Sequence, residues 1–221
     1  MPSSLSTTTA AATTVAAVET PNNAAGRLPL AAPDATRAAE LARAKLTLHS
    51  ALRHFPDFPI PGIDFVDILP LFATAARQET LLAALEAEVL AGFGGVPDVI
   101  VALDARGFLF GPGLALRLGC GFAPVRKSGK IPGPTVEVGF KKEYGEDFFQ
   151  MQGDAVEKGH KVLVVDDIIA TGGSAKAGGD LVEKLGGEVM GYLFILELDF
   201  LKGRDLLNAP VRTLLAQEEK Q

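Results

Sequence analysis

The residues best placed to do chemistry lie in one run, Val162-Leu163-Val164-Val165-Asp166-Asp167-Ile168-Ile169-Ala170-Thr171-Gly172-Gly173-Ser174. Apolar residues followed by two carboxylates are typical of a buried parallel strand whose carboxyl end delivers charge to a crevice. The small residues from Ala170 to Ser174 predict a turn with free backbone N–H groups at a helix N-terminus, where a phosphate can bind. Ser174 can cap that helix or donate its hydroxyl to a phosphate oxygen. The carboxylates suit sugar hydroxyls or a nearby divalent cation better than a phosphate, so the run predicts a site for a phosphorylated sugar.

This run resembles the phosphoribosyl pyrophosphate motif of the type I phosphoribosyltransferases. The competing explanation is a generic strand-to-helix turn with Asp at the strand end and Gly for tight packing. Neither a Gly-x-Gly-x-x-Gly after a strand nor a Gly-Lys-Ser/Thr loop is present. The resemblance implies an α/β fold: a central, mainly parallel sheet flanked by helices, with an N-terminal helical flap (hood) and a mobile catalytic loop. It also implies phosphoribosyl pyrophosphate as a substrate, with Mg²⁺ held mainly by that substrate near Asp166 and Asp167 and no direct protein ligand.

A second loop, Asp104-Ala105-Arg106-Gly107, follows the first strong apolar strand and should lie at the same edge of the sheet. On its own it reads equally well as a tight turn with Gly107 at positive φ and Arg106 paired with Asp104. Beside the acid pair we favour a ligand loop, because pyrophosphate needs N–H donors and a cation. In the resembled family this loop binds pyrophosphate and often contains a cis peptide bond, which corresponds to Asp104-Ala105 here.

Three cations, Arg126, Lys127 and Lys130, follow the next expected strand. Such a run is usually a solvated surface. Because these three cations lie at the carboxyl end of a strand, we favour the interpretation that they form a second group of pyrophosphate ligands.

Several further stretches resemble the adenine-specific subfamily, and the ending Glu197-Leu198-Asp199-Phe200-Leu201-Lys202-Gly203-Arg204 is similar to fungal members in particular. Glu143-Tyr144-Gly145 matches the loop that closes over the substrates in that subfamily, where the Glu is assigned to proton transfer at the purine N7. The resemblance implies Glu143 and Arg106 as catalytic residues. A lone Glu in a Gly-flanked loop is otherwise a solubility residue.

The resemblance also places adenine at Asp64-Phe65-Val66, in a flap over about residues 55–75. Phe65 would stack on the base, while the main chain of Asp64 and Val66 reads its edge. Val66 stands where family members often have Arg, but the family makes that contact with the main chain. We expect residues 55–65 to form an irregular loop, because the stretch is rich in proline.

Composition bounds the remaining possibilities. The chain has 221 residues, 48% of them hydrophobic, and a net charge of −6, which argues against nucleic acid or an anionic membrane as the main partner. No apolar run approaches the roughly 20 residues of a membrane-spanning helix. The single cysteine, Cys120, excludes an internal disulfide and suits a reducing compartment, so we expect a cytoplasmic protein.

Residues 1–33 are rich in Ala, Thr and Ser with few large apolar side chains, which predicts a disordered tail; a transit peptide would need more Arg. Residues 34–221 are expected to form one domain. Periodicity predicts helices over about 34–54, 78–91, 109–118 and 174–185, and strands over 98–103, 122–126, 148–152, 162–167 and, last, 189–196.

Together these features predict an enzyme that converts adenine and phosphoribosyl pyrophosphate to AMP and pyrophosphate, expected as a homodimer from the resemblance alone. One rival is the same chemistry on hypoxanthine, xanthine or orotate. The other is a regulatory protein that senses a purine or phosphoribosyl pyrophosphate, but neither a helix-turn-helix nor a basic patch is visible.

Overall fold

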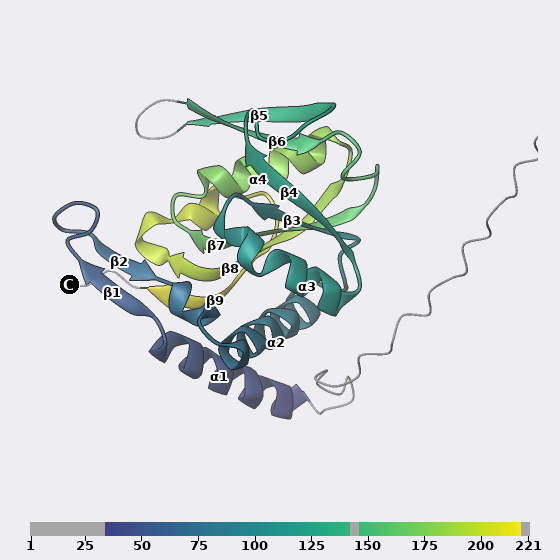
Figure 1. Cartoon of the computed structure of the whole chain (residues 1–221). Helices are drawn as coiled ribbons and strands as arrows, with labels where there is room; N and C mark the ends of the chain where they lie inside the picture. The colour runs from purple at the N-terminus through teal and green to yellow at the C-terminus, as the bar shows by residue number, and fades with distance from the viewer. Residues whose placement is uncertain (1–33, 142–145, 218–221) are drawn as a thin grey trace, which may run out of the picture.

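The computed structural model describes residues 34–141 and 146–217 and places them around a mixed seven-stranded sheet of order β5-β6-β4-β3-β7-β8-β9 (Figure 1). The helices are α1 (Asp34–Ser50), α2 (Ala75–Gly92), α3 (Gly111–Leu118) and α4 (Gly173–Lys184). The sheet strands are β3 (Val99–Leu103), β4 (Gly121–Lys127), β5 (Thr135–Lys141), β6 (Glu146–Gln152), β7 (Lys161–Ile169), β8 (Glu188–Leu198) and β9 (Val211–Gln217). A separate two-stranded sheet pairs β1 (Arg53–Pro56) with β2 (Asp64–Asp67). Short 3₁₀ helices cover Leu69–Phe72, Arg106–Leu109, Asp199–Leu201 and Gly203–Leu206.

Five adjacent strands, β4, β3, β7, β8 and the edge strand β9, run parallel, while β5 and β6 form an antiparallel hairpin beside β4. Each residue of β3 is buried, as expected for a strand covered on both faces by helices.

Two layers of helices cover the sheet, as Figure 1 shows, with α1, α2 and α3 on one face and α4 on the other. Alternate residues of β3 separate into the two cores: Ile100 packs in the same cluster as Leu85 of α2, whereas Val101 packs in the cluster of Leu181 from α4. This alternation follows from the two-residue period of a strand.

The expected α/β fold is confirmed, and its helices and strands over 98–126 and 161–196 lie within a few residues of the predicted ranges. Three expectations were wrong, and one strand was not predicted. The stretch 55–65 is not wholly irregular, because Phe55 pairs with Phe65 in the β1/β2 hairpin. Pro56 is accommodated at the end of an edge strand, where no donor is required. The helix expected over 34–54 ends at Ser50, and Arg53 and His54 belong to β1. The last strand of the sheet is β9 and not β8, and β5 was the strand not predicted.

Within the described ranges, no helix has the length and apolar character needed to cross a bilayer.

Candidate functional site

The two predicted ligand loops follow β3 and β7, which are hydrogen-bonded neighbours in the sheet. From β3 the chain passes through α3 on one face to β4, and from β7 it passes through α4 on the other face to β8. The strand order therefore reverses between β3 and β7. In open α/β sheets, ligands bind in the crevice at this point, beyond the carboxyl ends of the strands.

Asp166 and Asp167 lie near the end of β7, and the Asp167 side chain is 4% exposed. The backbone N–H of Asp167 donates to Oδ1 of Asp166 over 2.9 Å. Burial, followed by the adjacent charge of Asp167, raises the pKa of Asp166 well above its ordinary value. Burial also raises the pKa of Asp167, although the nearby Arg106 guanidinium opposes this shift. The pair is therefore held in a desolvated environment that disfavours two negative charges.

The loop after β3 brings a cation to this acid pair. Arg106 begins a short 3₁₀ helix, and its Nε lies 2.6 Å from Oδ2 of Asp167. Although the atoms are close, the oxygen accepts no hydrogen bond of ordinary geometry from the described residues, so we regard the contact as an ion pair. Arg106 thus pairs with Asp167, across the crevice, and not with Asp104.

Close packing between the loops depends on Gly107. A Cβ atom at this position would lie 3.1 Å from the carbonyl oxygen of Val165 and 3.4 Å from Oδ1 of Asp166. The absence of a side chain therefore lets the backbone of the first loop approach the acid pair directly.

Residues 170–174 join β7 to α4 in the predicted turn. Gly172 occupies the N-cap position with φ +82°, a left-handed conformation that favours glycine. Glycine has no side-chain acceptor for the first N–H groups of α4, and Gly173 and Ser174 form the first residues of the helix. These donors and the helix dipole make the turn suited to an anion.

The basic cluster also lies at this edge of the sheet, at the carboxyl end of β4. Nε of Arg126 is 3.3 Å from Oδ2 of Asp104, and its Nη1 donates to the Lys130 carbonyl oxygen over 3.3 Å. Lys127 lies 3.8 Å from Asp147 on β6. The peptide bond between Asp104 and Ala105 is cis, as the resemblance implies. The structure therefore brings Asp104, Arg106 and Arg126 together around the ends of β3, β4 and β7.

The predicted base-binding residues lie on β2, in the hairpin that extends in Figure 1 on the side where β8 and β9 end. Phe65 contacts the Phe58 ring edge-on, with centroids 5.3 Å apart, and His54 Nδ1 lies 3.0 Å from Oδ2 of Asp64. Val66 is buried in the core. Glu143, Tyr144 and Gly145 lie outside the described residues.

Our sequence interpretation gave no individual role to Glu197 or Arg204, which form a bidentate ion pair near the loop 170–174. Glu197 is 4% exposed, and a carboxylate is seldom buried to this extent unless it is paired, as Glu197 is with Arg204. The signal was available as a Glu ending an apolar strand, followed by Gly203-Arg204.

Comparison with known proteins gives consistent results. Residues 74–208 match the phosphoribosyl transferase domain family. An adenine phosphoribosyltransferase of Yarrowia lipolytica is 57% identical over 173 residues, which cover 78% of this chain and 95% of that protein. A homologue in Candida albicans with the same name is 54% identical over 174 residues, covering 78% and 91% of the respective chains.

Solved structures agree in fold. The adenine phosphoribosyltransferase of Saccharomyces cerevisiae, complexed with an imino-altritol bisphosphate and adenine, superposes with a TM-score of 0.77 at 51% identity, covering 79% of this chain and 99% of that one. The Trypanosoma brucei enzyme, solved with AMP, pyrophosphate and ribose 5-phosphate, has a TM-score of 0.71 at 25% identity, covering 78% and 79%. With this fold and these relatives, the chain belongs to the adenine phosphoribosyltransferases, enzymes of the type I phosphoribosyltransferase fold.

Proposed function

We propose that the crevice between β3 and β7 binds phosphoribosyl pyrophosphate and transfers its phosphoribosyl group to N9 of adenine. The bond from the anomeric carbon to the pyrophosphate oxygen breaks, the bond to N9 forms, and the products are AMP and pyrophosphate. The observation that carries this proposal is the meeting of an acid pair, an anion-binding turn and a cation-bearing loop at one switch point.

The sugar phosphate is assigned to the end of β7. Asp166 and Asp167 accept hydrogen bonds from the ribose hydroxyls, and the turn formed by Ala170, Thr171, Gly172, Gly173 and Ser174 donates to the 5-phosphate. Backbone N–H donors at the start of α4 support this assignment, because the helix fixes their positions and they can donate to an anion without ordering a long side chain.

Mg²⁺ fits the donors present here. Carboxylate oxygens such as those of Asp166 and Asp167 are ligands that Mg²⁺ prefers. Oδ2 of Asp167 accepts no directed hydrogen bond from the described residues, although the Arg106 guanidinium lies 2.6 Å away as its ion-pair partner. The described residues contain no cluster of three or more acidic, His or Cys side chains that could hold a metal by itself. We assign the cation mainly to the substrate's phosphates, near Asp166 and Asp167; when bound, it would neutralise charge on the leaving pyrophosphate.

The leaving group is assigned to the opposite side of the crevice. Asp104, Ala105, Arg106 and Gly107 surround the pyrophosphate, and Arg126, Lys127 and Lys130 supply further positive charge. Departure of pyrophosphate builds positive charge on the anomeric carbon and negative charge on the leaving oxygens. Fixed cations beside those oxygens lower the barrier because they need no reorganisation.

Adenine is assigned to the β1/β2 hairpin. Phe65 is available for stacking, and the backbone of Asp64 and Val66 can read the edge of the base. Glu143, carried over from the resemblance alone, manages the proton at N7. From the same source come a homodimer and a cytoplasmic location, and sedimentation of the purified protein would test the first.

The test is product analysis. Purified protein is mixed with Mg²⁺, phosphoribosyl pyrophosphate and one base at a time, chosen from adenine, hypoxanthine, guanine, xanthine and orotate. AMP formed from adenine, with little product from the other bases, is the expected result. A different preferred base would contradict the assignment of adenine, and no product with any base would contradict the proposed chemistry.

A further inference from the structure

The loop proposed to bind the 5-phosphate is in direct backbone contact with a segment far away in the sequence. A Cβ atom at Gly203 would overlap the carbonyl oxygen of Ala170 and lie 2.8 Å from the backbone nitrogen of Gly172. Conversely, a Cβ at Gly172 would overlap the carbonyl oxygen of Gly203. The two backbones therefore touch at the centre of the loop, and the position of residue 203 limits where the loop can lie.

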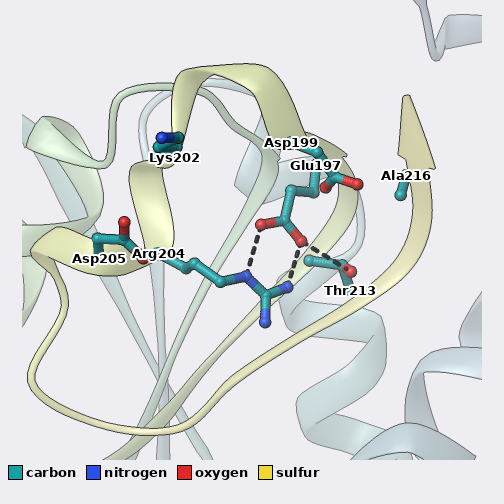
Figure 2. Close-up of a pocket in the computed structure, with 7 residues that line it drawn as sticks. All are labelled: Glu197, Asp199, Lys202, Arg204, Asp205, Thr213 and Ala216. Carbon is teal, nitrogen blue, oxygen red and sulfur yellow. Dashed lines mark hydrogen bonds and ion pairs between the residues drawn. The ribbon is translucent and has the colours of Figure 1, made fainter. Parts of the chain in front are cut away.

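An ion pair holds this segment against the sheet, as Figure 2 shows. Nε of Arg204 donates to Oε1 of Glu197 over 2.6 Å, and Nη2 donates to Oε2 of the same carboxylate. Thr213 on β9 donates its hydroxyl to Oε2 over 3.3 Å. Both carboxylate oxygens are therefore bonded, in the two-pronged geometry that orients a guanidinium most firmly.

The anchor point for this ion pair is rigid and close to the loop. Glu197 lies on β8, directly opposite Ile169, the residue that precedes the loop on β7. Its side chain is 5% exposed, whereas that of Arg204 is 47% exposed. The buried carboxylate is thus fixed by the sheet, and the half-exposed arginine connects the turn 199–206 to it.

We propose that the Glu197–Arg204 pair is a positioning device for the phosphate loop, holding Gly203 against Ala170 and Gly172 so that the loop's N–H groups stay aligned for the 5-phosphate. This inference rests on the proposed function of the loop 170–174. Glu197 and Arg204 are positioning residues, since they act through Gly203. A shift of the loop by a fraction of an ångström weakens several hydrogen bonds to the same phosphate at once.

Three variants test the device at its three points. Glu197→Gln keeps the size of the buried side chain but removes its charge, and Arg204→Lys keeps the charge but loses the two-pronged geometry. Gly203→Ala places a methyl group into the contact itself; Gly203 has no left-handed φ, so its backbone conformation accepts alanine. Glu197, Arg204 and Asp205 all line one surface pocket, which Figure 2 shows. Asp205→Asn is the matched control, because Asp205 lies in this pocket but makes no hydrogen bond to Glu197 in the structure.

The measurements are KM for phosphoribosyl pyrophosphate, KM for adenine, and the Kd of AMP by calorimetry, with thermal unfolding of each variant. We expect KM for phosphoribosyl pyrophosphate and the Kd of AMP to rise about tenfold in all three variants. KM for adenine should change less than about twofold. AMP reports on the loop because it carries the same 5-phosphate. Asp205→Asn should match the parent in all three.

Folded variants with the parent's AMP Kd, or with equal rises in both KM values, would overturn the inference. If Glu197→Gln or Gly203→Ala does not fold, the Arg204→Lys variant tests the inference by itself. The Arg204 side chain is half exposed, so replacing it with Lys leaves no cavity in the core. A parent protein that makes no AMP would contradict the proposed function instead, so the two failures are distinguishable.

Discussion

Arg106, in the loop after β3, and Asp167, near the end of the neighbouring strand β7, form an ion pair across the crevice, with 2.6 Å between Nε and Oδ2. The pair joins the proposed pyrophosphate side of the site to the proposed ribose side. It also offsets part of the burial cost of the Asp167 charge, since the guanidinium lowers the pKa that burial raises. Arg106 therefore stabilises the Asp167 carboxylate in the structure, and under the proposed function it would also face the leaving pyrophosphate.

Replacing Arg106 with Gln should lower kcat/KM for phosphoribosyl pyrophosphate by about 10²-fold, because one fixed donor to developing negative charge is removed. KM for adenine should change little. Steady-state kinetics with each substrate varied in turn measure both. Lys176→Gln, which removes an exposed cation paired with Asp180 on α4, is the control. Kinetics of the Arg106 variant that match this control would contradict the assigned role.

Asp166→Asn should separate stability from activity. Because the pKa of Asp166 is higher in the folded protein than the ordinary value of about 3.9, the folded state binds more protons between these two values, and the free energy of unfolding falls as pH rises through that window. The neutral Asn avoids this loss and can still accept the N–H of Asp167. At pH 7 to 8 the variant should therefore have a higher free energy of unfolding than the parent, and the difference should shrink toward pH 4.

The same variant should lose activity, because a charged hydrogen bond to the ligand is worth about 1.5 to 3 kcal/mol. Denaturant unfolding at several pH values and steady-state kinetics provide the two measurements. Parent-like kinetics in both Asp166→Asn and Asp167→Asn would refute the sugar-site assignment.

Adenine should be preferred over hypoxanthine by about 10⁴-fold in kcat/KM. If a backbone carbonyl of the proposed adenine site accepts from the 6-amino group, the same carbonyl would face the 6-oxo group of hypoxanthine. A buried acceptor would then be left without a donor. Competition of the two bases, with products separated by chromatography, gives the ratio directly. Comparable kcat/KM values for the two bases would contradict the assignment of adenine as the base, but would not contradict the proposed phosphoribosyl transfer.

Glu143→Gln and Glu143→Leu distinguish proton transfer from hydrogen bonding. If Glu143 transfers a proton near N7, both variants should lower kcat by about 10²- to 10⁴-fold while the Kd of phosphoribosyl pyrophosphate changes little. If Glu143 only donates a hydrogen bond, Gln should retain most activity and Leu should not. Single-turnover rates make the comparison, and parent rates in both would show that Glu143 has no part in the chemistry.

Deleting residues 1–33 should leave kcat and Tm nearly unchanged, because this stretch has few side chains able to bury apolar surface. Thermal unfolding and kinetics of a chain beginning at Asp34 measure this. A large decrease in either quantity would show that the stretch packs on the enzyme.

The sequence by itself determined the alternating architecture and the location of the proposed site. A continuous apolar run such as Val162–Val165 is typical of a strand that is buried on both faces. The small residues of the Thr171-Gly172-Gly173-Ser174 turn are typical of an anion-binding turn at a helix N-terminus. These signals are local: they depend on residue type and period, so they are readable without knowing what packs nearby.

Tertiary structure alone decided the pairings. The alternative interpretation of this loop as a tight turn paired Arg106 with Asp104. Because β3 and β7 are neighbours, Arg106 lies against Asp167 instead, and Asp104 pairs with Arg126. Residues 211–217 form β9 because they pair with β8 in the folded sheet. The turn 199–206 connects these two strands, and in the folded structure its Gly203 lies against Ala170 of the loop after β7. Such contacts join residues far apart in the chain, and their free energy depends on the surrounding fold and not on any local pattern.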